Sequence, residues 1–343
     1  MTLPAQTFMA EEIAEAGAAV ARGLADAAIE NAARAARAQN PAVVVTIARG
    51  SSDHAALYLK YLIEITLGLP CASMGPSVAS LYRAPLKLTQ ALAISISQSG
   101  RSPDIVEMQR AARRAGAFTL ALVNDATSPL AADPHALAPL HAGPERSVAA
   151  TKSMIAALVA GARLVAEWAD DAALRAALTQ LPGALDAQAQ APPEALIARV
   201  ARAKSAFVLG RGATYALAQE AALKLKETCA IHAEAFSSAE VLHGPAEIVG
   251  EGFLVIAFLA QDEAREGMLA TLARFAERGA DVIEIDAGGD DGPRRLAAQA
   301  LPHPHATPIA MIHRFYSVAE ACARRLERDP DRPRNLSKVT STQ

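Results

Sequence analysis

Aromatic residues and cysteines are scarce in this sequence of 343 residues. Phe, Trp and Tyr together make up 4% of the chain and hydrophobic residues 52%, so the core must be built largely from Ala, Leu, Val and Ile. The three cysteines, Cys71, Cys229 and Cys322, lie far apart and form neither a Cys-x-x-Cys pair nor a Cys/His spacing typical of zinc ligands. The sequence therefore predicts neither a disulfide framework nor a metal site.

The sequence also lacks an excess of basic charge and a long apolar run. Its formal net charge is -3 at pH 7, which argues against nucleic acid as the main partner and favours a small substrate. The first residues show no basic segment followed by an apolar stretch, and no uninterrupted apolar run reaches membrane-spanning length. We therefore expect a cytoplasmic protein that has no membrane partner.

Short β-branched runs alternate with helical patterns along both halves of the chain. They lie at 42–48, 91–97, 117–123, 206–209, 253–259 and 281–285. This alternation predicts parallel sheets covered by helices on both faces. Residues 10–39, with the spacing of one or two helices, and about 152–202 are helical instead. The predicted fold class is therefore α/β, with two doubly wound parallel-sheet domains in tandem after an N-terminal helical segment.

The second half of the chain repeats the first. Residues 49–52 (RGSS) correspond to 211–214 (RGAT) at an offset of 162, and 79–85 correspond to 239–245 at an offset of 160. Such similar offsets indicate duplication of one α/β domain. The expected parts are a helical segment at 1–40, a first domain at 41–165, a helical linker at 166–200, a second domain at 201–328 and a tail at 329–343 that closes the active site.

The segment 97–102 (SQSGRS) joins a strand-like run to a helical pattern that starts near Pro103. A strand that ends in small hydroxyl residues and Gly before a helix presents N–H groups and hydroxyls to an anion. The segment 49–52 ends the earlier run in the same way, and ligands bind beyond the carboxyl ends of such strands. Either segment alone also fits an ordinary turn with a serine helix cap. Together they predict a phosphate site.

Candidate acid–base groups lie in the second half and the tail. Lys224 and Glu227 are three residues apart, which places them on one helix face, although a solvated amphipathic helix shows the same pattern. Glu227 could move a proton between neighbouring carbons, and Lys224 could stabilise an enediolate. His243 precedes Gly-Pro, as many loop residues do, yet imidazole suits proton transfer to a sugar ring oxygen. Lys338 is a candidate Schiff-base nucleophile or carbonyl-positioning group.

Six segments together resemble the tandem sugar isomerase (SIS) domain family, in particular the isomerase half of glucosamine-6-phosphate synthases. They are 97–100 (SQSG), 147–152 (SVAATK), 222–227 (ALKLKE), 231–235 (IHAEA), 243–245 (HGP) and 333–338 (PRNLSK). The resemblance covers nearly the whole chain. It implies two flavodoxin-like SIS domains.

The resemblance also implies a role for each matching residue. Glu227 matches the base that moves a proton between C1 and C2, with Lys224 beside it. His243 matches the ring-opening histidine, which reaches in across the interface of a homodimer, and Lys338 matches the lysine near the open-chain carbonyl. The residues that match positions around the phosphate and the sugar are Ser52, Ser97, Gln98, Ser99, Ser102, Val148, Ala149 and Ser337. No metal or organic cofactor is implied, because side chains can run these proton transfers.

The expected function is that of an amino-sugar phosphate deaminase/isomerase. It would convert glucosamine 6-phosphate into fructose 6-phosphate and ammonia by ring opening, C1–C2 proton transfer and imine hydrolysis. Synthases of the family carry a glutaminase domain with a cysteine directly after the initiator Met, whereas Thr2 stands here, so glutamine-driven synthesis is not expected of this chain. Arg101 and Ser102 replace the Glu-Thr pair usual in synthases and resemble the stand-alone deaminases, although an exposed Arg101 also fits a loop.

Other functions remain open from the sequence. Within the enzyme class they are ammonia-dependent synthesis of glucosamine 6-phosphate, release of sugar phosphate from fructosamine-type adducts, and plain aldose–ketose isomerisation. A phosphosugar-binding regulatory protein would need the serine segments. It would have no chemical need for Glu227, His243 and Lys338 together.

Overall fold

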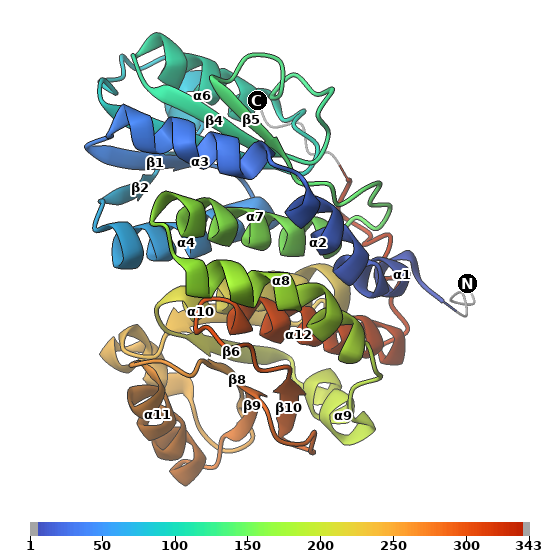
Figure 1. The fold of residues 1–343 in the computed structure, drawn as a ribbon. Coiled ribbons are helices and arrows are strands. Elements are labelled where there is room, and N and C mark those ends of the chain that lie inside the picture. Colours follow the sequence, from blue (N-terminus) through green and yellow to red (C-terminus); the bar gives the residue numbers. More distant parts are fainter. Residues whose placement is uncertain (1–5, 339–343) are drawn as a thin grey trace. The chain divides into compact units, whose positions relative to one another are not determined.

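The computed structural model describes residues 6–338 of the chain, and these residues form two compact units. Each unit is built around one five-stranded sheet (Figure 1). The first-sheet unit contains residues 18–145 and 152–179 with Ser337 and Lys338, and the second-sheet unit contains residues 6–17, 146–151 and 180–336. Neither unit is one continuous stretch of chain. The domain bounds expected from the sequence stay predictions.

The first sheet has the strand order β2-β1-β3-β4-β5, and every pair is parallel. Its strands are β1 (Val43–Ile47), β2 (Cys71–Ser73), β3 (Ala91–Ser97), β4 (Phe118–Val123) and β5 (Ala136–Pro139). β1, β3 and β4 confirm the three strands predicted in this half. The sequence does not predict β2 and β5, because these edge strands are only 3 and 4 residues long and contain no β-branched residue.

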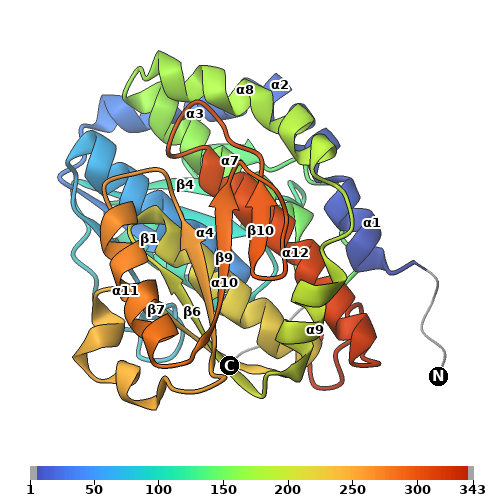
Figure 2. The same cartoon turned by 90° about the horizontal axis from the view of Figure 1, so that it is seen from below.

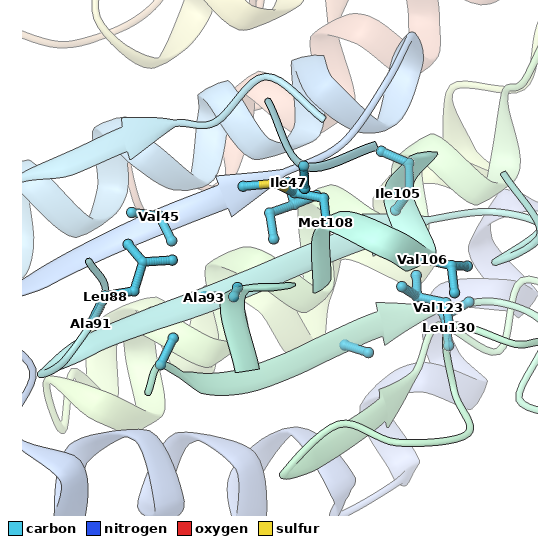
Figure 3. Packing of buried hydrophobic residues seen from close by; sticks show 14 residues of the cluster. Val45, Ile47, Leu88, Ala91, Ala93, Ile105, Val106, Met108, Val123 and Leu130 are labelled. Atoms are coloured by element: carbon cyan, nitrogen blue, oxygen red, sulfur yellow. The ribbon is translucent and has the colours of Figure 1, made fainter. Parts of the chain in front are cut away.

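Helices flank the first sheet. They are α2 (Ala16–Ala25), α3 (Ala28–Gln39), α4 (Ser51–Leu62), α5 (Ser77–Ser80), α6 (Pro103–Arg114) and α7 (Lys152–Trp168). Val45, Ile47 and Ala93 of the strands belong to one hydrophobic cluster with Ile105 and Met108 of α6 (Figure 3). Helices α3 and α4 contact strands of the same sheet and pack against α7. The buried residues are mostly aliphatic, as the low aromatic content requires.

The second sheet repeats this topology. Its order is β7-β6-β8-β9-β10, again parallel throughout, which is the order of the first sheet with each strand replaced by its counterpart. Its strands are β6 (Ser205–Gly210), β7 (His232–Ser237), β8 (Leu254–Leu259), β9 (Asp281–Ala287) and β10 (Arg295–Ala298). β6, β8 and β9 confirm the predicted strands. The edge strands β7 and β10 are again the ones that the sequence does not predict.

Helices lie on both sides of the second sheet. The helices with residues in this unit are α1 (Phe8–Ala14), α8 (Ala172–Ala187), α9 (Glu194–Arg202), α10 (Ala213–Lys224), α11 (Arg265–Glu277) and α12 (Thr307–Arg325). Ala257 and Leu259 of β8 share a cluster with Phe275 of α11. Phe258, between them, points to the opposite face and meets Phe315 of α12 edge-on, with ring centroids 5.9 Å apart. Helices α11 and α12 therefore cover opposite faces (Figure 2).

The backbone at the start of each half shows the duplication directly. Gly50 has φ +55° and ψ -135°, and Gly212, its counterpart, has φ +58° and ψ -135°. Positive φ favours glycine, so both turns depend on it. Helices α4 and α10 each run for 12 residues and continue into a five-residue π-helix, η1 (Ile63–Leu67) and η2 (Leu225–Cys229).

The N-terminal region differs from the expectation of one or two helices. It forms three, because α1 ends at Ala14 and a further break precedes α3, where the Asp26 carboxylate accepts a hydrogen bond from the Ala28 N–H at 2.9 Å. Between residues 6 and 338, no helix is both long and apolar enough to span a bilayer. The same part of the chain holds no group of three or more His, Cys, Asp or Glu side chains placed to bind a metal.

Candidate active site

The two serine segments end neighbouring strands of the first sheet. β1 pairs with β3 in a register that sets Ile47 opposite Ser95, so the segments that begin at Arg49 and Ser97 leave the sheet side by side. The chain connections run in opposite directions from this pair of strands, which is the switch point where ligands bind in such sheets. The structure thus brings Ser52, Ser97, Gln98, Ser99 and Ser102 to one edge of the first sheet.

The segment from Ser97 to Ser102, here called the phosphate cradle, is shaped by its own hydrogen bonds. The Ser97 hydroxyl accepts from the Gly100 N–H at 3.0 Å, and the Ser99 hydroxyl accepts from the Arg101 N–H at 3.3 Å. Each hydroxyl keeps its own hydrogen to donate. Gly100 has φ +61°, and a Cβ there would lie 2.0 Å from the Ser128 hydroxyl oxygen, so no other residue fits. Ser102 precedes α6 and makes no side-chain cap hydrogen bond, and Pro103 has no N–H, so the first N–H that the helix can offer an anion is that of Asp104.

An ion pair joins the serine segment that begins at Arg49 to the start of α6. Both Nε and Nη2 of Arg49 donate to Oδ2 of Asp104, at 3.1 and 3.0 Å. Asp104 lies in the first turn of α6 with its side chain 4% exposed, and its other oxygen accepts from the Ile105 N–H at 2.9 Å. Nearby, burial raises the pKa of Asp53 above its ordinary value, although the charges of His54 and Arg49 act in the opposite direction.

The side chain of Arg101, a residue of the cradle, forms an ion pair with a neighbouring loop. Its Nη2 lies 2.8 Å from Oδ2 of Asp125, in the loop that follows β4. Hydrogen bonds from Thr127 and Arg101 lower the pKa of the Asp125 carboxyl. This ion pair fits the interpretation of Arg101 as an exposed loop residue.

Lys338 is held within the first-sheet unit. Its Nζ lies 3.1 Å from Oε2 of Glu145, whose side chain is fully buried. The same carboxylate accepts from the Ser153 N–H at 3.1 Å and from the Ser153 hydroxyl at 2.6 Å. Ser337 is exposed. Lys338, the last described residue, therefore has a defined contact with a buried carboxylate.

Lys224 and Glu227 form an ion pair in the second-sheet unit. Lys224 ends α10 and Glu227 lies in the π-helix η2, a type of local widening often found at functional sites. The Nζ atom of Lys224 lies 2.6 Å from Oε2 of Glu227 and 3.4 Å from Oε1 of Glu220. The hydroxyl of Tyr316 donates to the same Glu220 oxygen at 3.2 Å. The buried ammonium of Lys224 is thus shared by the carboxylates of Glu227 and Glu220.

Residues 146–151 lie against this group. Lys224 donates to the Ala150 carbonyl at 3.2 Å, and the Ala149 carbonyl accepts from the Ser147 hydroxyl at 2.8 Å. The Val148 N–H donates to the Asp331 carbonyl at 3.0 Å, so this N–H already has a partner within the unit. The Asp331 carboxylate in turn accepts hydrogen bonds from the N–H groups of Phe8 and Met9 in the first turn of α1, both at 2.8 Å.

His243 is exposed. It ends the 3₁₀ turn η3 (Glu240–His243) that follows β7, directly before Gly244 with φ +147°. An exposed imidazole at this point is accessible to solvent and to a partner.

The predicted site residues fall into two sets. Ser52, Ser97, Gln98, Ser99, Ser102, Ser337 and Lys338 belong to the first-sheet unit, and Val148, Ala149, Lys224, Glu227 and His243 belong to the second-sheet unit. Sequence reasoning missed the partners Asp104, Glu145 and Glu220. Only Glu220 carried a signal, because it stands four residues before Lys224 and four-residue spacing places side chains on one helix face.

Comparison with known proteins identifies the family of this chain. The model of the SIS domain family matches residues 39–166 and 199–321. A glutamine–fructose-6-phosphate aminotransferase (isomerizing) of Thermus thermophilus is 36% identical over 318 residues, covering 88% of this chain and 52% of the relative. This chain belongs to the SIS domain family, with two SIS domains in tandem. It spans about half the length of the curated relatives it matches.

Solved structures show the same fold over almost the whole chain. A provisionally named phosphosugar isomerase from Silicibacter pomeroyi is 46% identical, with a TM-score of 0.88, and the match covers 95% of this chain and 100% of that one. The C-terminal domain of glucosamine-fructose-6-phosphate aminotransferase from Francisella tularensis is 25% identical, with a TM-score of 0.80, and the match covers 96% and 98%. The resemblance to the isomerase half of the synthases is therefore confirmed.

Proposed function

We propose that this chain is an enzyme of amino-sugar phosphate metabolism that converts glucosamine 6-phosphate and water into fructose 6-phosphate and ammonia. The observation that carries the proposal is the ion pair between Lys224 and Glu227, 2.6 Å apart, in which the lysine is fully buried and the glutamate is 20% exposed. A buried charged pair costs desolvation free energy that a purely structural role does not require. A partly exposed carboxylate beside a fixed ammonium suits proton abstraction next to a carbonyl.

The reaction divides into three steps. The phosphate cradle of the first-sheet unit holds the sugar phosphate, and His243, supplied by the second subunit of a homodimer, transfers the proton that opens the ring. Glu227 then removes the proton from C2 and returns it to C1, while Lys224 stabilises the negative charge on oxygen. The product is an imine at C2. Water adds to that carbon, the C–N bond breaks, and ammonia leaves the ketose.

Lys338 has a separate role in this proposal. Its ammonium, fixed by the buried carboxylate of Glu145 at 3.1 Å, orients the open-chain carbonyl. After losing a proton, the Lys338 amine can also add to the carbonyl carbon of the ketose and form an imine as the carbonyl oxygen leaves as water.

Deamination needs only water as a co-reactant, whereas synthesis of glucosamine 6-phosphate needs a supply of ammonia. The test follows glucosamine 6-phosphate, a fructosamine 6-phosphate adduct and glucose 6-phosphate by ¹³C and ³¹P NMR with the purified chain. Conversion of glucosamine 6-phosphate to the ketose supports the proposal. Conversion of the adduct alone, or of glucose 6-phosphate alone, contradicts it in favour of deglycation or plain isomerisation, and binding without conversion of any of them favours a regulatory protein.

A further inference from the structure

The phosphate cradle lies next to a buried negative charge. Asp104 occupies the first turn of α6, directly beyond the cradle, with its side chain 4% exposed. A carboxylate at a helix N-terminus occupies the position that an incoming phosphate would use. Two negative groups this close repel each other unless a cation compensates one of them.

Arg49 is the cation in contact with this carboxylate. Two of its five N–H groups donate to Oδ2 of Asp104, while Oδ1 is bound by the Ile105 N–H. Arg49 follows β1 in the first serine segment. Its contact with Asp104 therefore joins that segment to the helix that begins directly after the second one. A two-donor contact to one carboxylate fixes both distance and orientation better than a single bond.

We propose that Arg49 is a positioning residue of the phosphate cradle, which cancels the charge of Asp104 and fixes the spacing of the two serine segments. The inference rests on the proposed function, because it takes the cradle to be the phosphate site. It assigns to Arg49 an effect on sugar-phosphate binding and not on the chemical step, since Arg49 acts through Asp104 and α6.

Arg113 provides a control outside the cradle. It lies in the last turn of α6 with a side-chain exposure of 36%, against 53% for Arg49, and it forms an ion pair with Asp133. The two pairs differ in the partner, because Asp133 is 65% exposed and Asp104 only 4%. An ion pair with such a solvated carboxylate contributes little to stability.

The experiment measures glucose 6-phosphate binding by calorimetry for the unaltered chain and for Arg49→Ala, Arg113→Ala, Asp104→Asn and the double variant Arg49→Ala/Asp104→Asn. We expect Arg49→Ala to raise Kd about ten-fold or more, which corresponds to the loss of about one charge-assisted contact. Arg113→Ala should change Kd less than about three-fold. The double variant should recover most of the affinity, because the uncompensated carboxylate is gone.

A Kd for Arg49→Ala within two-fold of the unaltered chain overturns the inference. So does a double variant that binds no better than Arg49→Ala, because the inference attributes the lost affinity to the uncompensated charge of Asp104. A general loss of folding in Arg49→Ala would likewise not be repaired by Asp104→Asn. Thermal unfolding without ligand identifies such a loss directly. Because binding is read with a sugar that carries no amino group, failure of the deaminase reaction leaves this result unaffected.

Discussion

The Nζ atom of Lys224 lies 2.6 Å from Oε2 of Glu227, at the junction where α10 becomes a π-helix. Lys224 is fully buried, and Glu220 on its other side is buried as well. Glu227 is the one member of the three that reaches solvent. The ammonium therefore fixes the direction of the carboxylate while leaving it accessible, and this arrangement is required of a proton-transferring base.

Replacing Glu227 with Gln removes the base but keeps the shape of the side chain. We expect turnover of glucosamine 6-phosphate to fall by about two orders of magnitude or more, the usual contribution of a positioned general base. The Kd for the sugar phosphate should stay within about three-fold, because the cradle is untouched. Steady-state kinetics and calorimetry on the same preparation check both numbers, and retained turnover would contradict the role of Glu227.

Replacing Lys224 with Met leaves two carboxylates near each other without their shared cation. We expect the free energy of unfolding to fall by about 3–5 kcal/mol, the usual cost of breaking a buried pair from one side. Tyr316→Phe, which removes the hydroxyl that donates to Glu220, should cost about 1.5–3 kcal/mol. Urea unfolding measures both. Equal stability of Lys224→Met and the unaltered chain would show that the carboxylates do not depend on this lysine.

Replacing Ser99 with Ala removes one hydroxyl donor from the phosphate cradle. We expect KM for the sugar phosphate to rise about ten-fold while kcat changes little, because the phosphate is bound equally in the ground state and the transition state. Ser128→Ala is the matched control, since the buried Ser128 hydroxyl has no hydrogen-bond partner among the described residues. A fall in kcat with unchanged KM would place Ser99 outside the phosphate site.

His313 makes the stability of the second-sheet unit depend on pH. Its Nε2 lies 2.9 Å from the Ile13 carbonyl, so Nε2 carries the hydrogen and Nδ1 accepts from the Gln188 amide at 2.9 Å. Burial lowers the pKa of His313 below its ordinary value of 6.5; the Arg314 charge acts in the same direction, and the hydrogen bond to Ile13 opposes it.

The sign of the effect follows from proton uptake. Below pH 6.5 the unfolded chain binds a proton at this histidine before the folded chain does, so stability falls as the pH drops through this range. Above pH 6.5 the contribution of His313 to stability does not change with pH. Urea unfolding at pH 5.5 and 7.5 should show a smaller difference for His313→Leu than for the unaltered chain. An equal difference in both would contradict this account.

Much of this fold can be predicted from local sequence. β3 and β8 are mostly apolar because both faces of a central parallel strand are buried, and the SQSG turn at 97–100 follows from residue types alone. The edge strands β2 and β5 give no such signal, since they are short and contain no β-branched residue. Sequence patterns predict those structural features that residues close together in the chain determine.

Long-range partners escape that reasoning. Asp331 binds the N-terminus of α1 from more than three hundred residues away, and Glu145 binds Lys338 across 193 positions. No spacing rule connects such residues, because the fold alone brings them together. The pair between Lys224 and Glu227 could be predicted for the opposite reason, since the two residues share one helix face.

The most direct test of the central claim is ammonia release from glucosamine 6-phosphate by the purified chain without glutamine, followed in parallel with fructose 6-phosphate formation. The account predicts that both products appear in equal amounts and that both disappear in Glu227→Gln. Fructose 6-phosphate without ammonia, or neither product while the sugar phosphate still binds, would contradict it.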